Sequence, residues 1–176
     1  MNADRTIRLA RTDDLEAIAT VHVEGWQWGY RGQLPDAQLD AIDREARRGL
    51  WQRVLAGEFP DTDVFVAEQS DRVVGFVSAG PSRDAEAGED DAEIYALYVS
   101  RDAAGSPAGH ELLTAAVDAL RERGAVAITL WALESNERAR RFYDRAGFVT
   151  DGASKTEPWA GVELREVRYR KNLGPT

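Results

Sequence analysis

The sequence contains no cysteine, and this absence excludes several kinds of chemistry at once. Thiol nucleophiles, disulfides and cysteine-based metal sites all require that residue. Histidine is almost as scarce, with two copies, and the pattern G-x-S-x-G does not occur. A hydrolase built on a Ser-His-Asp triad is therefore not expected. Two histidines alone do not make a metal site, so no metal is predicted.

The sequence also lacks a long hydrophobic run and an excess of positive charge. No apolar segment approaches the roughly 20 residues of a membrane span, and the charged stretch MNADRTIRLARTDDLE is unlike a signal peptide, so we expect a cytoplasmic protein. The net charge of −9, from 22 basic and 31 acidic residues, disfavours nucleic acid and anionic lipid as partners. It favours a cationic ligand, unless the acidity serves solubility alone.

What is present suffices for one folded domain. With 176 residues and 43% hydrophobic residues, the chain has the size and composition of a domain with its own core. We find no internal repeat and no long linker. The sequence therefore predicts a single domain over residues 1–176.

Hydrophobic periodicity predicts an α/β fold. Strands are predicted over residues 6–10, 64–67, 73–77, 94–99, 126–131 and 162–169. Four helices are predicted: one capped by Thr12, one from about Pro35 through Val54, one ending at Gly124 and one ending before Gly147. The order β-α-α-β-β-β-α-β-α-β predicts a mixed sheet with helices on its faces. Residues 80–91, GPSRDAEAGEDD, read as a long hairpin connection.

The first candidate site is a strand, a short loop and an amphipathic helix in the segment AEIYALYVSRDAAGSPAGHELL. Loop amides and a helix N-terminus that point at one spot can bind a pyrophosphate. The loop is neither a Walker A sequence nor a Rossmann fingerprint, because G-K-S/T and G-x-G-x-x-G are missing. The amides expected to contribute are those of Gly105, Ser106, Ala108, Gly109 and His110.

The second candidate site lies in LWALESNERARRFYDRAGF, where a predicted strand is followed by Asn136, Phe142, Tyr143 and the pair Gly147-Phe148. Residues seven apart lie on one helix face, so Asn136 and Tyr143 are expected to border the same cleft. Spacing alone would also fit two core aromatics at 142 and 143.

Together the two segments resemble motifs A and B of the GNAT superfamily of N-acetyltransferases. Motif B, Asn-x-x-Ala-x-x-Phe-Tyr followed by Gly-Phe, matches closely. Motif A, Arg/Gln-x-x-Gly-x-Gly/Ala, matches only at Gly109: Ala104 replaces the arginine or glutamine, and Pro107, which has no N–H, replaces the middle glycine. The resemblance covers about residues 7–169. It implies a mixed, mostly antiparallel sheet of six to seven strands with helices on both faces.

The resemblance also implies an activity: transfer of an acetyl group from acetyl-CoA to a primary amine of a small molecule by direct attack. Tyr143 takes the place of the general acid that protonates the leaving thiolate, and Asn136 that of a residue holding the cofactor arm. The backbone of Leu97, Tyr98 and Val99 would pair with the pantetheine. Glu93 falls where some members carry a general base, which is useful because an amine with a pKa near 10.4 is protonated at neutral pH. Glu93 could equally be a solvated strand carboxylate.

The aromatic segment GWQWGYRGQLP is the candidate acceptor site, because this region commonly shapes the acceptor pocket in the family. Its glycines predict a loop at a helix end. Trp26 and Tyr30, together with Trp131, are expected to contact the acceptor, since aromatic faces suit cations and flat groups. Alternatively, some of these rings only fix the loop to the sheet. The resemblance is compatible with a homodimer, although nothing in the sequence marks an interface.

A second hypothesis follows from the altered motif A. Because Ala104 and Pro107 each remove a donor, the chain could be a non-catalytic GNAT-like module that binds a ligand or partner and has weakened CoA binding.

Overall fold

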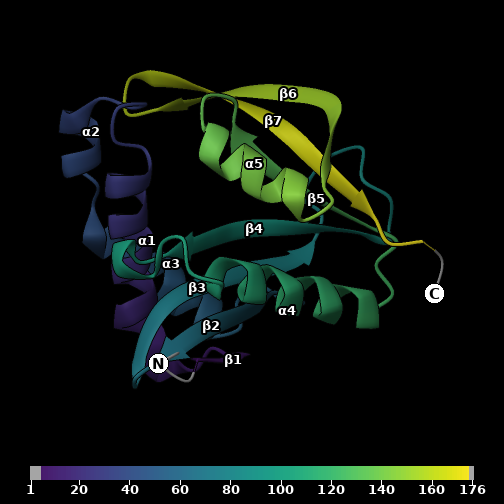
Figure 1. The fold of residues 1–176 in the computed structure, drawn as a ribbon, viewed down its shortest axis with the longest axis horizontal. Coiled ribbons are helices and arrows are strands. Elements are labelled where there is room, and N and C mark those ends of the chain that lie inside the picture. The colour runs from purple at the N-terminus through teal and green to yellow at the C-terminus, as the bar shows by residue number, and fades with distance from the viewer. Residues whose placement is uncertain (1–4, 175–176) are drawn as a thin grey trace.

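The computed structural model describes residues 5–174, which form one seven-stranded sheet in the order β1-β2-β3-β4-β5-β7-β6 (Figure 1). The strands are β1 (Arg5–Leu9), β2 (Asp63–Gln69), β3 (Arg72–Pro81), β4 (Asp91–Val99), β5 (Ala127–Leu133), β6 (Val149–Trp159) and β7 (Val162–Asn172). The helices are α1 (Leu15–Gly29), α2 (Asp36–Asp40), α3 (Arg44–Leu55), α4 (Ala108–Glu122) and α5 (Glu137–Arg145). Neighbouring strands are antiparallel except β4 and β5, which are parallel.

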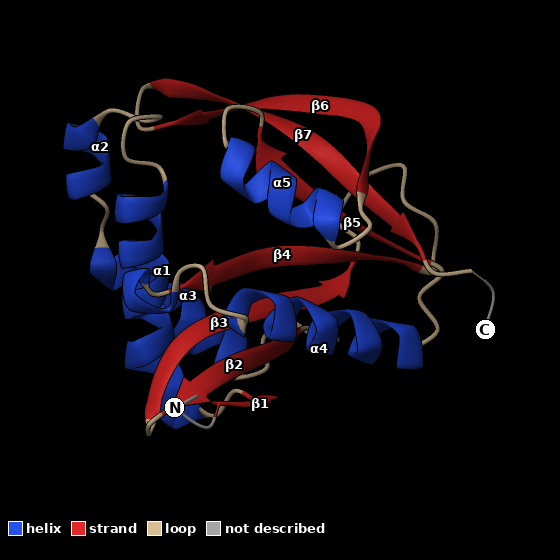
Figure 2. Cartoon of the chain, viewed as in Figure 1, coloured by secondary structure: helices blue, strands red, loops and turns tan. Residues whose placement is uncertain are grey.

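Helices cover both faces of the sheet, and each face has its own core. Figure 2 shows α4 and α5 on the face toward the viewer, where Leu112, Ile128 and Tyr169 are fully buried. On the opposite face, α1 and α3 pack on the first half of the sheet around Ile18 and Phe76. The expected mixed, mostly antiparallel sheet with helices on both faces is confirmed.

The two parallel strands separate after four residue pairs. β4 and β5 are in register from Asp91 opposite Ala127 to Ile94 opposite Leu130, and no further. Directly after Ile94, Tyr95 has no partner on β3, because the register shifts there. Such a bulge bends its strand, which turns β4 away from β5. The rest of β4 and the end of β5 therefore diverge and leave a gap in the sheet.

The structure contradicts the predicted loop at the aromatic segment. Helix α1 continues through Gly25 and ends only at Gly29. The reason lies in packing: a Cβ at position 25 would lie 2.9 Å from Cδ1 of Tyr98, so glycine lets the helix approach β4 closely. Tertiary contact outweighs the low helix propensity of glycine here.

Two further expectations at element boundaries were wrong. Thr12 does not cap α1. It begins a 3₁₀ turn in which Asp14 Oδ2 accepts a hydrogen bond from the amide of Arg11 at 2.7 Å. The predicted second helix is two helices, because Asp43 caps α3 by accepting from the amide of Ala46.

Strand β6 was not predicted at all. Its sequence is polar and contains a glycine and a proline, so it lacks the hydrophobic alternation by which strands are predicted. The strand pairs on one side only, with β7.

Among the described residues, no helix is long and apolar enough to cross a membrane. His22 of α1 is a buried polar residue whose ring nitrogen is paired. Its Nδ1 accepts a hydrogen bond from Trp51 Nε1 at 2.9 Å, and its ring contacts Phe76 and Tyr98. Burial lowers the pKa of His22 to about 3, with a smaller contribution from the charge of Arg47. His22 is therefore a packed core residue.

The buried neutral His22 should make stability depend on pH. The unfolded chain binds a proton at His22 below pH about 6.5, whereas the folded protein excludes it until pH about 3, so stability is lost as the pH falls. We expect the free energy of unfolding to drop by up to about 1.4 kcal/mol per pH unit between pH 6 and 4 from this group. Urea titrations should show a shallower pH slope for His22→Gln, whereas His110→Gln, at the exposed histidine, should keep the steep one. An unchanged slope in His22→Gln would contradict this assignment.

Candidate active site

The gap between β4 and β5 opens into a cleft of about 630 Å³. Its walls come from elements far apart in the sequence: the end of α1, the diverging halves of β4 and β5, the loop before α4 with its first turn, and α5. In Figure 1, α4 and α5 lie on either side of this opening. Both candidate sites from the sequence therefore meet in one cavity.

One wall of the cleft is a free strand edge. Leu97, Tyr98 and Val99 pair with β3 on one side only, and on the other side they face the cleft. Unpaired amides and carbonyls along such an edge can bond an extended, amide-containing ligand as an added strand would. The three residues expected to pair with pantetheine thus present their backbone to the cavity.

The loop before α4 presents backbone amides at the same cavity. Gly105 has a positive φ of 83°, and Pro107 has φ −65° at the start of α4, as its ring requires. Of the amides expected to bind phosphate, two have protein acceptors: that of Ser106 bonds Ala103 O, and that of Ala108 bonds Ser106 Oγ. The other three of these five amides, those of Gly105, Gly109 and His110, have no protein acceptor within the described part of the chain.

An acidic residue beside this loop is neutralised. Glu111, in the first turn of α4, would repel a bound anion. Arg5 Nε donates to its carboxylate at 2.7 Å, and this guanidinium is mostly buried. Arg5 also lies 3.4 Å from Ser106 Oγ, so it places positive charge next to the loop.

Asn136 serves the local structure and also faces the cleft. Its Oδ1 accepts a hydrogen bond from the amide of Ala139 at 3.1 Å, which caps α5. The residue lines the cavity as well, and its side-chain amide group remains able to donate.

Tyr143 lines the cleft from α5, opposite the free edge of β4. Its ring packs between Phe142, Phe148 and Tyr169, with centroid distances of 5.2, 6.1 and 6.0 Å. Burial raises the pKa of Tyr143 well above its usual value, and nearby Tyr98 adds to the shift. The phenol therefore stays protonated at neutral pH and is able to donate a proton within the cavity.

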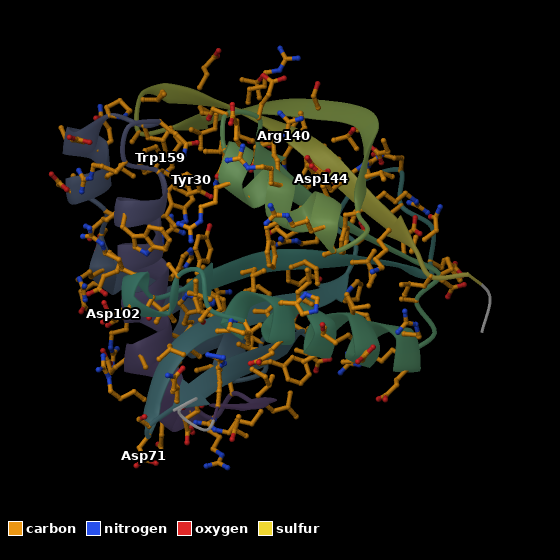
Figure 3. All side chains as sticks on the ribbon, viewed as in Figure 1. Tyr30, Asp71, Asp102, Arg140, Asp144 and Trp159 are labelled. Atoms are coloured by element: carbon orange, nitrogen blue, oxygen red, sulfur yellow. The ribbon has the colours of Figure 1, made fainter. Side chains whose placement is uncertain are left out.

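Two of the three expected acceptor-binding aromatics line the cleft, Tyr30 and Trp131. Trp26 does not. It packs behind Tyr30 at 4.9 Å and against Trp159 at 5.1 Å, and Figure 3 shows Tyr30 and Trp159 next to each other where α1 meets the β6–β7 hairpin. The face of Trp131 is already covered by Lys155, whose Nζ lies 4.5 Å from the ring centroid.

Glu93 is buried and is not among the residues that line the cleft. Its Oε2 accepts a hydrogen bond from the amide of Arg83 at 2.9 Å, in the long β3–β4 connection. That connection also reaches β5, where Asp84 accepts from Trp131 Nε1 at 2.9 Å. The structure therefore brings Tyr143, Asn136 and the loop amides together but sets Glu93 behind the cavity wall.

The sequence reasoning overlooked a set of cleft residues on α5. Arg138, Arg141 and Arg145 all line the cavity. Trp28 of α1, which belongs to the aromatic segment expected to bind the acceptor, lines it as well. The spacing of the three arginines in the sequence could have indicated this, because residues three and four positions apart lie on the same face of a helix. Charged residues on an amphipathic helix usually face solvent, so this face was not singled out.

The family model and the related sequences agree on one protein family. The sequence model of the Acetyltransferase (GNAT) family matches residues 20–148. The chain is 31% identical to the uncharacterized N-acetyltransferase YuaI of Bacillus subtilis, over 92% of this chain and 90% of that protein. It is 32% identical to a mycothiol acetyltransferase of Acidimicrobium ferrooxidans over 68% of this chain, but only 42% of that longer protein.

The fold has close counterparts among solved structures. PaiA N-acetyltransferase from Thermoplasma acidophilum, solved in complex with coenzyme A, superposes with a TM-score of 0.75 at 21% identity, over 96% of this chain and 99% of that one. The expectations of this superfamily and of acetyl-CoA as co-substrate are confirmed. The chain belongs to the GNAT family of acetyltransferases and is an acyl-CoA-dependent N-acetyltransferase.

Proposed function

We propose that this protein transfers the acetyl group of acetyl-CoA to a primary amine of a small molecule, by direct attack within the cleft. One observation carries the proposal: a half-buried, protonated Tyr143 shares a single cavity with the free edge of β4 and three unpaired amides. These residues fit the co-substrate, because the edge suits the amides of pantetheine and the loop suits a pyrophosphate.

In this mechanism the protein's residues position the reactants and move two protons. The amine nitrogen attacks the thioester carbonyl carbon, and the carbon–sulfur bond then breaks. Tyr143 gives its proton to the departing sulfur, so that CoA leaves as the thiol, and the phenolate regains a proton from solvent before the next turnover. The phenol, whose pKa is raised by burial, is protonated at neutral pH and keeps its proton until the sulfur leaves.

Glu93 accepts the proton that the amine loses. Because its carboxylate lies behind the cavity wall, the proton passes through a water molecule rather than directly. The amide of Arg83 donates to one carboxylate oxygen of Glu93, and the Arg83 guanidinium contacts the other at 3.5 Å. This second contact is long and leaves that oxygen a further lone pair to accept from a water molecule.

The acceptor is a small molecule that binds mainly through aromatic and hydrogen-bonding contacts with Tyr30 and Trp131. The names of the mycothiol acetyltransferases among the relatives support a small-molecule acceptor. The cationic acceptor expected from the net charge has less support. Within the described chain, no carboxylate lines the cleft, and Lys155 already occupies one face of Trp131. Trp26 contributes by supporting Tyr30 from behind.

A panel of amines incubated with acetyl-CoA tests the activity and the acceptor class together. We expect CoA release with at least one member of a panel that spans amino sugars, amino acids, polyamines, aminoglycosides and a peptide with a free N-terminus. Because the chain has no cysteine, a thiol reagent in the assay reports released CoA alone. If millimolar acetyl-CoA does not raise the melting temperature and no amine releases CoA, the non-catalytic module with weakened CoA binding is favoured instead.

Replacing Tyr143 with phenylalanine should separate catalysis from binding. The ring packing is retained, so we expect kcat to fall roughly 10²-fold or more while the Kd for acetyl-CoA changes little. Tyr169→Phe is the matched control, because Tyr169 contacts Tyr143 but lies outside the cleft lining, and its kcat should stay near the wild-type value. Equal losses of kcat and affinity in Tyr143→Phe would assign the phenol a structural role.

Two substitutions of Asn136 should separate its cap from its contact with the cofactor arm. Asn136→Asp keeps an oxygen for the amide of Ala139 and should retain stability, whereas Asn136→Ala should lower the free energy of unfolding by about 1 kcal/mol. Both variants lose the side-chain N–H donors, so both should bind CoA more weakly in calorimetry. Wild-type affinity in Asn136→Asp would reduce the role of this residue to capping.

A further inference from the structure

The charge of the cleft is opposite to that of the chain. The chain carries a net charge of −9, yet the charged side chains that line the cleft are Arg138, Arg141 and Arg145, with no aspartate or glutamate among the described lining residues. A cavity whose lining has this composition favours an anionic ligand.

The three arginines form one row on α5. Their spacing of three and four residues places them on one face of the helix. Arg140 points elsewhere: its Nε donates to Tyr169 Oη and its Nη1 to Glu134 O, and Figure 3 places it on the side of α5 away from α4. The three arginines therefore mark the side of α5 that faces the cleft, whereas Arg140 on another side of the helix is bonded to the protein.

The guanidinium groups of this row are largely free to bind a ligand. Arg141 pairs with Glu137 at 3.1 Å, but both side chains are well exposed, so this pair is weak. Arg138 stacks on the Trp28 ring, with its Cζ 4.8 Å from the centroid, and thus reaches from α5 to α1. The Trp28 indole N–H is buried in the cleft wall without a protein acceptor.

The row lies beside the amides that precede α4. A Cβ at Gly109 would be 3.7 Å from the Phe142 ring, so the first turn of α4 and the middle of α5 are in contact. Arg141 directly precedes Phe142, and Arg145 lies nearly one turn after it. Arg141 and Arg145 therefore line the same cavity as Gly105 and His110, whose amides have no protein acceptor.

We propose that Arg138, Arg141 and Arg145 bind a phosphate group of the CoA nucleotide and supply the positive charge that Ala104 does not. The inference rests on the acyl-CoA chemistry proposed above but on no particular acceptor. Hydrogen bonds from a guanidinium to phosphate are about twice as strong as neutral ones, so cations on α5 can offset the missing side-chain donor in the loop. Trp28 is a positioning residue, because its ring stacks on the Arg138 guanidinium.

Calorimetry with CoA tests the row without any amine present. We expect the triple variant Arg138→Gln/Arg141→Gln/Arg145→Gln to bind CoA about tenfold more weakly or worse, and its affinity to depend less on salt. Arg121→Gln, on the last turn of α4 and outside the cleft lining, is the matched control and should bind as the wild type does. Melting curves of the free proteins verify that each variant is folded.

Dephospho-CoA identifies the phosphate involved. If the row binds the 3′-phosphate, the triple variant should bind CoA and dephospho-CoA equally, whereas the wild type prefers CoA. If the row binds the pyrophosphate, the triple variant should lose affinity for both ligands by the same factor. A folded triple variant with wild-type affinity for CoA would overturn the proposal. A negative amine panel would leave this result intact, so the two failures are distinguishable.

Discussion

The separation of β4 from β5 is the constraint on which the rest of the site depends. Four pairs join the strands, and the bulge at Tyr95 then turns β4 aside. Everything chemically useful follows from this gap: a strand edge without a partner, a place for the loop before α4 to present its amides, and room for Tyr143 to face them. The energy forgone in unmade strand–strand hydrogen bonds becomes available to a ligand that makes them.

Packing around the gap keeps it from closing. On one face, α4 buries Leu112 against the sheet, while on the other α1 approaches Tyr98 so closely that only glycine fits at position 25. Helices α4 and α1 are thereby fixed to the half of the sheet that ends in β4. Helix α5 is fixed to the other half through the contact of Tyr143 with Tyr169 of β7. The cavity is thus built before any ligand arrives, which lowers the ordering cost of binding.

How much of this could be predicted from the sequence depended on the range of the determining interaction. Asn136, Tyr143 and the strand before them were predictable because their spacing is local. The helical course of Gly25 was not, since it depends on a contact with Tyr98, far along the chain. Strand β6 was not predicted because an edge strand needs little hydrophobic pattern. The role of the α5 arginines was not predicted because exposed charges on a helix usually bind no ligand.

The polar character of β6 has a consequence for self-association. As the last strand in the order, it exposes one full set of backbone groups to any neighbouring molecule. A kink at Gly152, the charge of Lys155 and the ring of Pro158 interrupt that border. A continuous intermolecular sheet through this strand is therefore disfavoured, and the same features that concealed β6 from pattern recognition protect the protein from edge-to-edge aggregation.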